Sequence, residues 1–158
     1  MKRHILIAVT HLLGAGHLTR MAALARGLAR AGHRVTLASG GMPAPLVRLD
    51  GVELLQLPPL RSNGVDFRTL LDADGKQASP ALLQERADLL ARAVREGRPD
   101  AVITELFPFG RRMLAAEFIT LIQAARALKP APILLASVRD VLVAPARAER
   151  VAEAEARL

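Results

Sequence analysis

"THLLGAGHLTRMAALARGLARAGHRV", residues 10–35, joins an apolar run to an amphipathic segment through a turn that contains two glycines. The run before it, 4–10, is rich in β-branched residues, which is typical of a strand buried on both faces. From His17 onward the apolar residues recur with helical spacing, and Gly32 follows them as a helix-ending glycine does. The stretch therefore predicts a strand, a turn and a helix, the first unit of a parallel α/β fold.

The same alternation of strands and helices continues along the chain. Pro80 is expected at the first position of a helix, and Pro58-Pro59 is expected to end the third strand. We expect strands at 34–39, 52–58, 99–106 and 132–137, helices at 79–96 and 111–128, a short helix or turn at 43–50 and a polar loop at 60–78. This order predicts a Rossmann-like parallel sheet with helices on both faces and right-handed crossovers.

Composition limits the classes of function. The 158 residues are enough for one domain, and half of them are hydrophobic, which indicates an ordered core. The four Phe, with no Trp or Tyr, argue against a base-stacking surface for nucleic acid. The lack of Cys excludes disulfides and thiolate metal sites. No apolar run approaches the roughly 20 residues of a membrane span, and the apolar start is better interpreted as a strand than as a signal peptide.

Positive charge is concentrated in the first third of the sequence. The net charge is +7, and residues 1–50 contain seven Lys or Arg against one acidic residue, Asp50. Such a basic segment suits an anionic ligand or an anionic membrane surface. A genome that prefers arginine codons explains the same excess equally well.

The turn at 14–20 has two interpretations. Gly14 and Gly16 let backbone N–H groups face an anion at the start of a helix. A dinucleotide fingerprint needs a third glycine, where this chain has Thr19, and an acidic residue after the second strand, which is absent. A nicotinamide or flavin dinucleotide is therefore not expected. The alternative is a turn without a ligand, which would not require His17 and Arg20 together.

His17 and Glu105 are the candidate catalytic residues. The positive end of the helix favours the neutral form of His17, which can act as a base; the alternative is a capping or packing histidine. Glu105 ends a buried strand, where it either orients His17 or pairs with Arg111 or Arg112. Arg20, one turn into the helix, either reaches a phosphate or carboxylate or is a solvated helix charge.

Further candidates follow the fourth and fifth strands. Gly110 is expected to begin a helix whose N–H groups, together with Arg111 and Arg112, face an anion; the alternative is a hinge turn with surface arginines. Ser137 and Arg139 are expected to line the same crevice. For Arg139 the alternative is an ion pair with the helical tail. The carboxyl ends of parallel strands share one edge of the sheet, so all these residues are expected near one crevice.

Three stretches together carry a resemblance to a known family. They are Gly14-x-Gly16-His17-x-x-Arg20 followed by "ARAGHRVTL", then "TELFPFGRR" (104–112) and "SVRDVL" (137–142). The chain resembles the N-terminal half of GT-B glycosyltransferases, and in particular bacterial predicted glycosyltransferases related to the lipid-linked GlcNAc transferase of peptidoglycan synthesis. The first motif also resembles nucleotide-sugar hydrolases that share the fold.

The resemblance implies an acceptor-side domain over 1–145 and a helical tail over 146–158 that leads to a donor-binding domain beyond this sequence. It implies transfer of a sugar from a nucleotide-sugar to an acceptor hydroxyl, with no metal or cofactor and with His17 as base. In related transferases an aspartate assists that histidine, where this chain has Glu105. A cytoplasmic location, with peripheral contact at the inner membrane face left open, is also implied. Hydrolysis of the nucleotide-sugar and a non-catalytic binding domain are the alternatives, and these residues alone are expected to be inactive.

Overall fold

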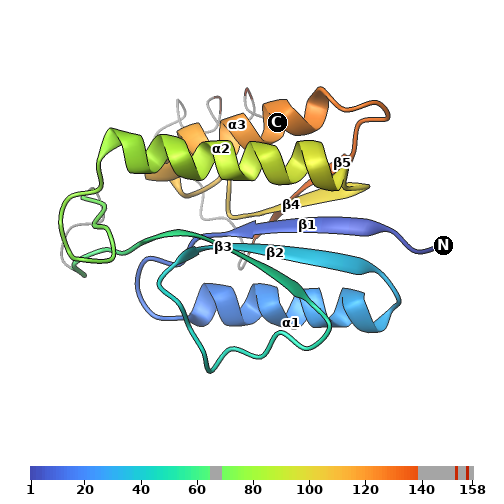
Figure 1. The fold of residues 1–158 in the computed structure, drawn as a ribbon, viewed down its shortest axis with the longest axis horizontal. Coiled ribbons are helices and arrows are strands. Elements are labelled where there is room, and N and C mark those ends of the chain that lie inside the picture. Colours follow the sequence, from blue (N-terminus) through green and yellow to red (C-terminus); the bar gives the residue numbers. More distant parts are fainter. Residues whose placement is uncertain (65–68, 139–151, 153–155, 157–158) are drawn as a thin grey trace.

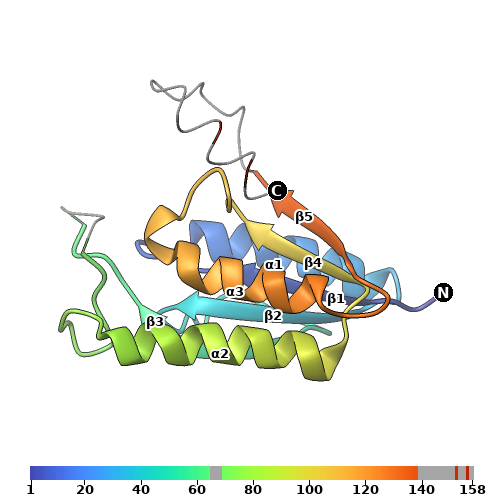
Figure 2. The same cartoon turned by 90° about the horizontal axis from the view of Figure 1, so that it is seen from above.

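The computed structural model describes residues 1–64, 69–138, 152 and 156. Five parallel strands form one sheet in the order β3-β2-β1-β4-β5. Helix α1 covers one face of the sheet, and α2 and α3 cover the other (Figures 1 and 2). The elements are β1 His4–Val9, α1 Gly16–Arg30, β2 Arg34–Gly41, β3 Glu53–Leu60, α2 Pro80–Gly97, β4 Ala101–Glu105, the 3-10 helix η1 Arg112–Leu114, α3 Ala115–Arg126 and β5 Ile133–Ser137. The predicted Rossmann-like class is confirmed.

Strand β1 lies at the centre of the sheet and is buried on both faces. Ile5, Ile7 and Val9 pack against α1, whereas Leu6 and Ala8 pack in the cluster under α2 and α3. Because successive side chains point to opposite faces, a strand covered by helices on both sides needs an unbroken apolar run. This requirement explains the apolar run at 4–10, which was predicted as a strand.

Two predicted helix boundaries follow from local hydrogen bonds. After α1, the N–H of Gly32 donates to the Ala29 carbonyl at 2.9 Å and that of His33 donates to the Leu28 carbonyl at 3.2 Å, while Gly32 has a φ of +90°. This is a Schellman ending, in which glycine accepts the left-handed conformation. At the start of α2, the Ser79 side chain accepts a hydrogen bond from the Leu82 N–H at 3.1 Å.

The structure corrects two of the predicted element boundaries. Strand β3 continues through Pro58-Pro59 to Leu60, because it is an edge strand and both prolines lie where its register with β2 shifts, between the Ser39–Gln56 and Gly41–Leu60 pairs. Residues 43–50, expected as a short helix or turn, form turns. The helix expected from 111 begins with one 3-10 turn, and α3 starts only at Ala115. The expected tail, 146–158, lies almost entirely outside the described residues, as does Arg139.

Candidate functional site

A buried carboxylate, that of Glu105, is the centre of the candidate site. Glu105 is the last residue of β4, and its side chain is 0% exposed. His17 Nδ1 lies 2.7 Å from Oε1, Arg20 Nη2 lies 3.1 Å from the same oxygen, and Arg111 Nη2 lies 3.3 Å from Oε2. These four residues and Ser137 are called the Glu105 cluster below. The sequence placed all five at one crevice, and the structure brings them into contact.

The contact with Glu105 determines which nitrogen of His17 holds the proton. A carboxylate oxygen only accepts hydrogen bonds, so Nδ1 donates, and in the neutral ring Nε2 then holds the lone pair. The His17 side chain is 25% exposed, whereas its carboxylate partner is fully buried. This arrangement combines a fixed ring orientation with a partly exposed side chain, as a general base requires.

Arg20 connects helix α1 to the end of β5. Its Nη1 donates to Ser137 Oγ at 3.0 Å, and its Nη2 donates to the Ser137 carbonyl at 3.4 Å. Nη1 also reaches the Val138 carbonyl at 3.4 Å. Of the alternatives for Arg20, contact with a carboxylate is the one the structure shows: its guanidinium is held by groups at the ends of two strands, β4 and β5.

The turn after β4 places Arg111 but corrects the expectation for Gly110. Leu106 and Arg111 both have positive φ, 62° and 59°, and the Gly110 N–H donates to the Leu106 carbonyl at 2.7 Å. Gly110 therefore closes a turn and does not begin a helix, so the expected N–H cradle is not formed there. Arg111 bends back to Glu105, whereas the Arg112 side chain is exposed at the start of η1.

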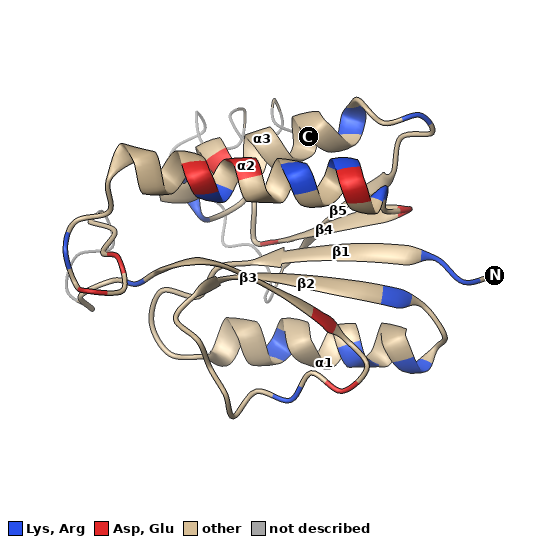
Figure 3. Ribbon diagram, in the orientation of Figure 1, with Lys and Arg blue, Asp and Glu red and all other residues tan. Residues whose placement is uncertain are grey.

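The start of α1, beside the Glu105 cluster, has no side-chain cap among the described residues. The N-cap is Ala15, which has no side chain able to cap, and the first turn contains no acidic residue. A Cβ on Gly16 would meet nothing within 4 Å, and Gly14 adopts a φ of +51°. Figure 3 shows only Lys and Arg colouring along α1, whereas α2 carries both signs. This helix end is therefore open and electropositive.

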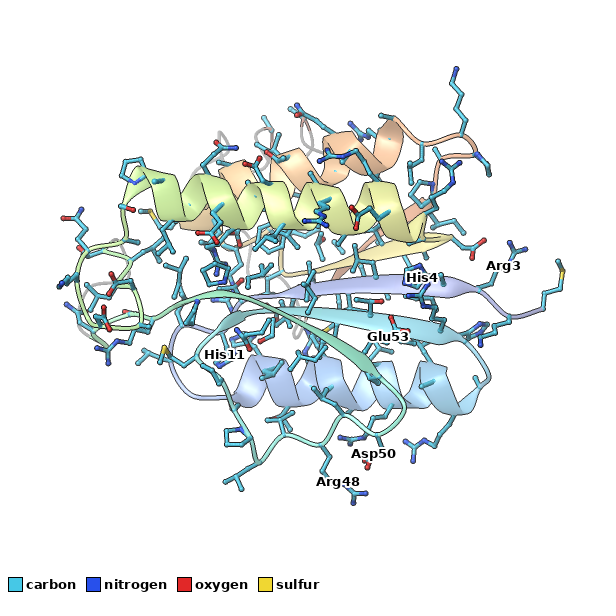
Figure 4. All side chains as sticks on the ribbon, viewed as in Figure 1. Arg3, His4, His11, Arg48, Asp50 and Glu53 are labelled. Carbon is cyan, nitrogen blue, oxygen red and sulfur yellow. The ribbon has the colours of Figure 1, made fainter. Side chains whose placement is uncertain are left out.

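His11 is a part of this region that sequence reasoning did not select. It follows the end of β1, at the opposite end of the sheet from Arg3 and His4 (Figure 4), and is only 6% exposed. Burial lowers the pKa of His11; the charges of Arg111 and His17 act in the same direction, and the Met42 backbone opposes them. Its Nδ1 has no hydrogen-bond partner within the described part of the chain. The sequence feature that could have selected His11 is its position beside the glycine-containing turn that also holds His17.

On the face of the sheet that α2 and α3 cover, a buried ion pair joins three strand ends to these two helices. Arg86 of α2 donates from Nε and Nη2 to the two oxygens of Glu117 on α3, at 2.8 and 2.9 Å. Its Nη1 donates to the carbonyls of Gly40 and Pro58, and its Nη2 also donates to Thr10 Oγ1 at 3.2 Å. All five N–H groups of the guanidinium are thus used. Sequence reasoning missed this pair, although each residue interrupts the apolar face of a predicted helix.

The Gly40-Gly41 pair is required by this close packing. A Cβ on Gly41 would lie 2.2 Å from the His11 carbonyl oxygen and 2.5 Å from the His11 ring. A Cβ on Gly40 would lie 2.2 Å from Thr10 Oγ1 and 2.4 Å from Arg86 Nη2. At Gly41 a larger residue would have to move backbone, and at Gly40 it would have to displace the buried Thr10 and Arg86 side chains, which explains why β2 ends in two glycines.

We expect Gly41→Ala to lower the free energy of unfolding by about 1–3 kcal/mol, because the added methyl overpacks against backbone. Gly27→Ala is the matched control: Gly27 lies within α1, where a Cβ would meet nothing within 4 Å, so this change should stabilise by up to about 1 kcal/mol. Urea unfolding of both variants measures the difference. Equal effects at the two positions would contradict the packing around His11.

No metal site is evident at this edge of the sheet. Within the described residues, no group of three or more His, Cys, Asp or Glu lies together in a way that would hold a metal ion. No described helix combines the length and the hydrophobicity needed to cross a membrane.

Comparison with known proteins places the fold. No protein-family model and no curated protein sequence matches the chain. MurG from Acinetobacter baumannii is 18% identical with a TM-score of 0.57, and the match covers 97% of this chain and 40% of MurG. The calicheamicin glycosyltransferase CalG4 is 21% identical with a TM-score of 0.54, over 98% of this chain and 37% of CalG4. A glycosyltransferase from Rickettsia africae is 19% identical with a TM-score of 0.50, and the match covers 85% of this chain and 29% of that protein.

These likenesses establish the fold alone, because the identities are low. The chain has the Rossmann-like fold found in the N-terminal half of GT-B glycosyltransferases. It spans between 29% and 40% of the length of these three solved structures.

Proposed function

We propose that this chain is the acceptor-side domain of a glycosyltransferase that moves a sugar from a nucleotide-sugar to an acceptor hydroxyl. The observation that carries the proposal is the 2.7 Å contact between His17 Nδ1 and the buried Glu105 carboxylate at the carboxyl edge of the sheet. Ligands of open parallel sheets bind at this edge. A histidine oriented by a carboxylate is a proton acceptor that needs no other group to fix its tautomer.

In the proposed reaction, His17 Nε2 takes the proton of the acceptor O–H. The freed oxygen attacks the anomeric carbon of the donor sugar, and the bond from that carbon to the nucleotide diphosphate breaks with both electrons leaving on the diphosphate. His17 then carries a positive charge, which the adjacent Glu105 carboxylate stabilises. The imidazolium later loses its proton to solvent, which restores the base.

The open start of α1 supports a place for the diphosphate. Backbone N–H groups at Gly16 and His17 could donate hydrogen bonds to an anion at this positive helix end, because no capping side chain competes for them. Gly14 and Gly16 leave space for this approach. Ser137, Arg20 and Arg111 are committed to contacts within the Glu105 cluster, so we propose that they act by holding the site. No metal or cofactor is part of the proposed reaction.

The same Nε2 lone pair would also activate water, which makes hydrolysis of the nucleotide-sugar the second candidate. The test uses the full-length protein supplied with a nucleotide-sugar, with and without an alcohol acceptor. Transfer predicts that nucleotide release rises at least tenfold when acceptor is added and matches the glycosylated product mole for mole. If nucleotide is released at the same rate with and without acceptor, the result would support hydrolysis and contradict transfer.

A further inference from the structure

The Glu105 carboxylate receives more cationic partners than its charge balances. Two guanidiniums, Arg20 and Arg111, and the His17 ring share it. We propose that Arg111 is a positioning residue that holds Glu105 so that Oε1 meets His17 Nδ1 and keeps the other ring nitrogen free. This inference rests on the proposed function, in which His17 is the base.

The contacts divide the two carboxylate oxygens between different partners. Oε1 accepts from His17 and Arg20, whereas Oε2 accepts from Arg111 Nη2 at 3.3 Å. A carboxylate held at both oxygens does not rotate about its terminal bond without breaking one of these contacts. Arg111 therefore contributes the constraint that fixes the orientation of Oε1 toward His17.

The backbone around Arg111 supports a specific role for its side chain. Leu106 and Arg111 both occupy the left-handed region, which non-glycine residues rarely adopt and which costs conformational free energy. Glycine at 111 would remove that cost there. Only 13% of the Arg111 side chain is exposed, and its Nε has no hydrogen-bond partner within residues 1–64 and 69–138. The strained backbone thus carries a buried guanidinium whose ion contact is Glu105.

Arg20 differs from Arg111 in what it connects. Its guanidinium divides between Glu105 and the carbonyl and hydroxyl of Ser137, so its removal would also loosen α1 from β5. Arg111 lies six residues from Glu105 on the same turn, and its loss would affect mainly the carboxylate. Arg111 is therefore the cleaner position for a test.

Arg111 also sets the charge around His17. The titratable and charged groups that face this space are His17 and Arg20 from α1, His11 after β1, Glu105 from β4 and Arg111. Loss of the Arg111 charge leaves Glu105 with Arg20 as its remaining guanidinium partner among the described residues. That partner contacts Oε1, so Oε2 would lose the contact that Arg111 gives it.

The decisive variant is Arg111→Gly, because glycine accepts the positive φ without strain while the guanidinium is lost. In ¹⁵N-histidine-labelled protein, the unchanged chain should show His17 protonated at Nδ1. Arg111→Gly should remain folded and show a mixture with the Nε2-protonated form. Arg111→Lys, which keeps the cation, should retain mostly the Nδ1 form, and Arg95→Gln, an exposed charge loss on α2, should be unchanged.

A second measurement separates this inference from the proposed function. In full-length protein, Arg111→Gly should lower kcat about tenfold to a hundredfold with little change in KM. If no variant transfers sugar, the proposed function fails, but the ring spectra still report on Arg111. An Arg111→Gly spectrum identical to that of the unchanged chain would overturn the positioning role.

Discussion

Replacing Arg86 with methionine is expected to lower the free energy of unfolding by about 3–5 kcal/mol, because the change leaves the Glu117 carboxylate buried without its partner. Both side chains are almost without solvent exposure, at 0% and 4%. The carbonyls of Gly40 and Pro58 also lose their donors, and an unsatisfied buried acceptor costs free energy of its own. Unfolding in guanidinium chloride measures the loss.

Arg92→Met is the matched control for this change. Arg92 forms an exposed pair with Glu96 one turn away on the same helix, at 2.8 Å, and such pairs contribute about 0.5 kcal/mol or less. The double variant Arg86→Met with Glu117→Leu should recover part of the stability, since no charge is then left buried. It should not recover all of it, because the strand-end carbonyls stay unpaired. Similar losses at Arg86 and Arg92 would contradict the role of the buried pair.

Replacing His17 with alanine in the full-length protein is expected to reduce kcat for sugar transfer by about 10²–10⁴-fold, the usual contribution of a general base. KM for the nucleotide-sugar should change little, because the backbone N–H groups at the start of α1 are kept. Glu105→Gln should also reduce kcat, since a neutral amide stabilises the charged ring less. The measurement is the initial rate of product formation at saturating donor and acceptor.

His33→Ala is the control for the His17 variant. His33 precedes β2 at the amino edge of the sheet, where its Nδ1 accepts a hydrogen bond from the Arg3 N–H at 3.2 Å. Its loss should leave kcat within about twofold, because it lies at the far end of the sheet from the Glu105 cluster. A His17→Ala protein that keeps the rate of the His33→Ala protein would show that His17 is no base.

The elements that local chemistry determines were predictable from the sequence. The β1 run, the glycine end of α1 and the Pro80 start of α2 depend on neighbours in the chain, and the structure confirms each. The meeting of His17 and Glu105 was also predictable, because parallel strands bring their carboxyl ends to one edge. The chemical role of each residue does not follow from its position at this edge alone.

The features that depend on distant contacts were not predictable. The path of β3 through two prolines follows from its place at the edge of the sheet, which local sequence does not specify. Arg86 and Glu117 are 31 residues apart and become partners only when α2 and α3 pack together. Gly110 looked like a helix start, but the left-handed conformation of Arg111 makes it part of a turn that returns to Glu105.

The central claim, that His17 takes the proton of the acceptor, is tested most directly by varying the acidity of the acceptor. Full-length unchanged and His17→Ala proteins are assayed with an alcohol and with a phenol or thiol that ionises near the assay pH. An acceptor that has already lost its proton needs no base. We predict that the His17→Ala change lowers the transfer rate about 10²–10⁴-fold with the alcohol but less than about tenfold with the acidic acceptor. An equal fall in the transfer rate with both acceptors would contradict this claim and would mean that His17 only lines the site.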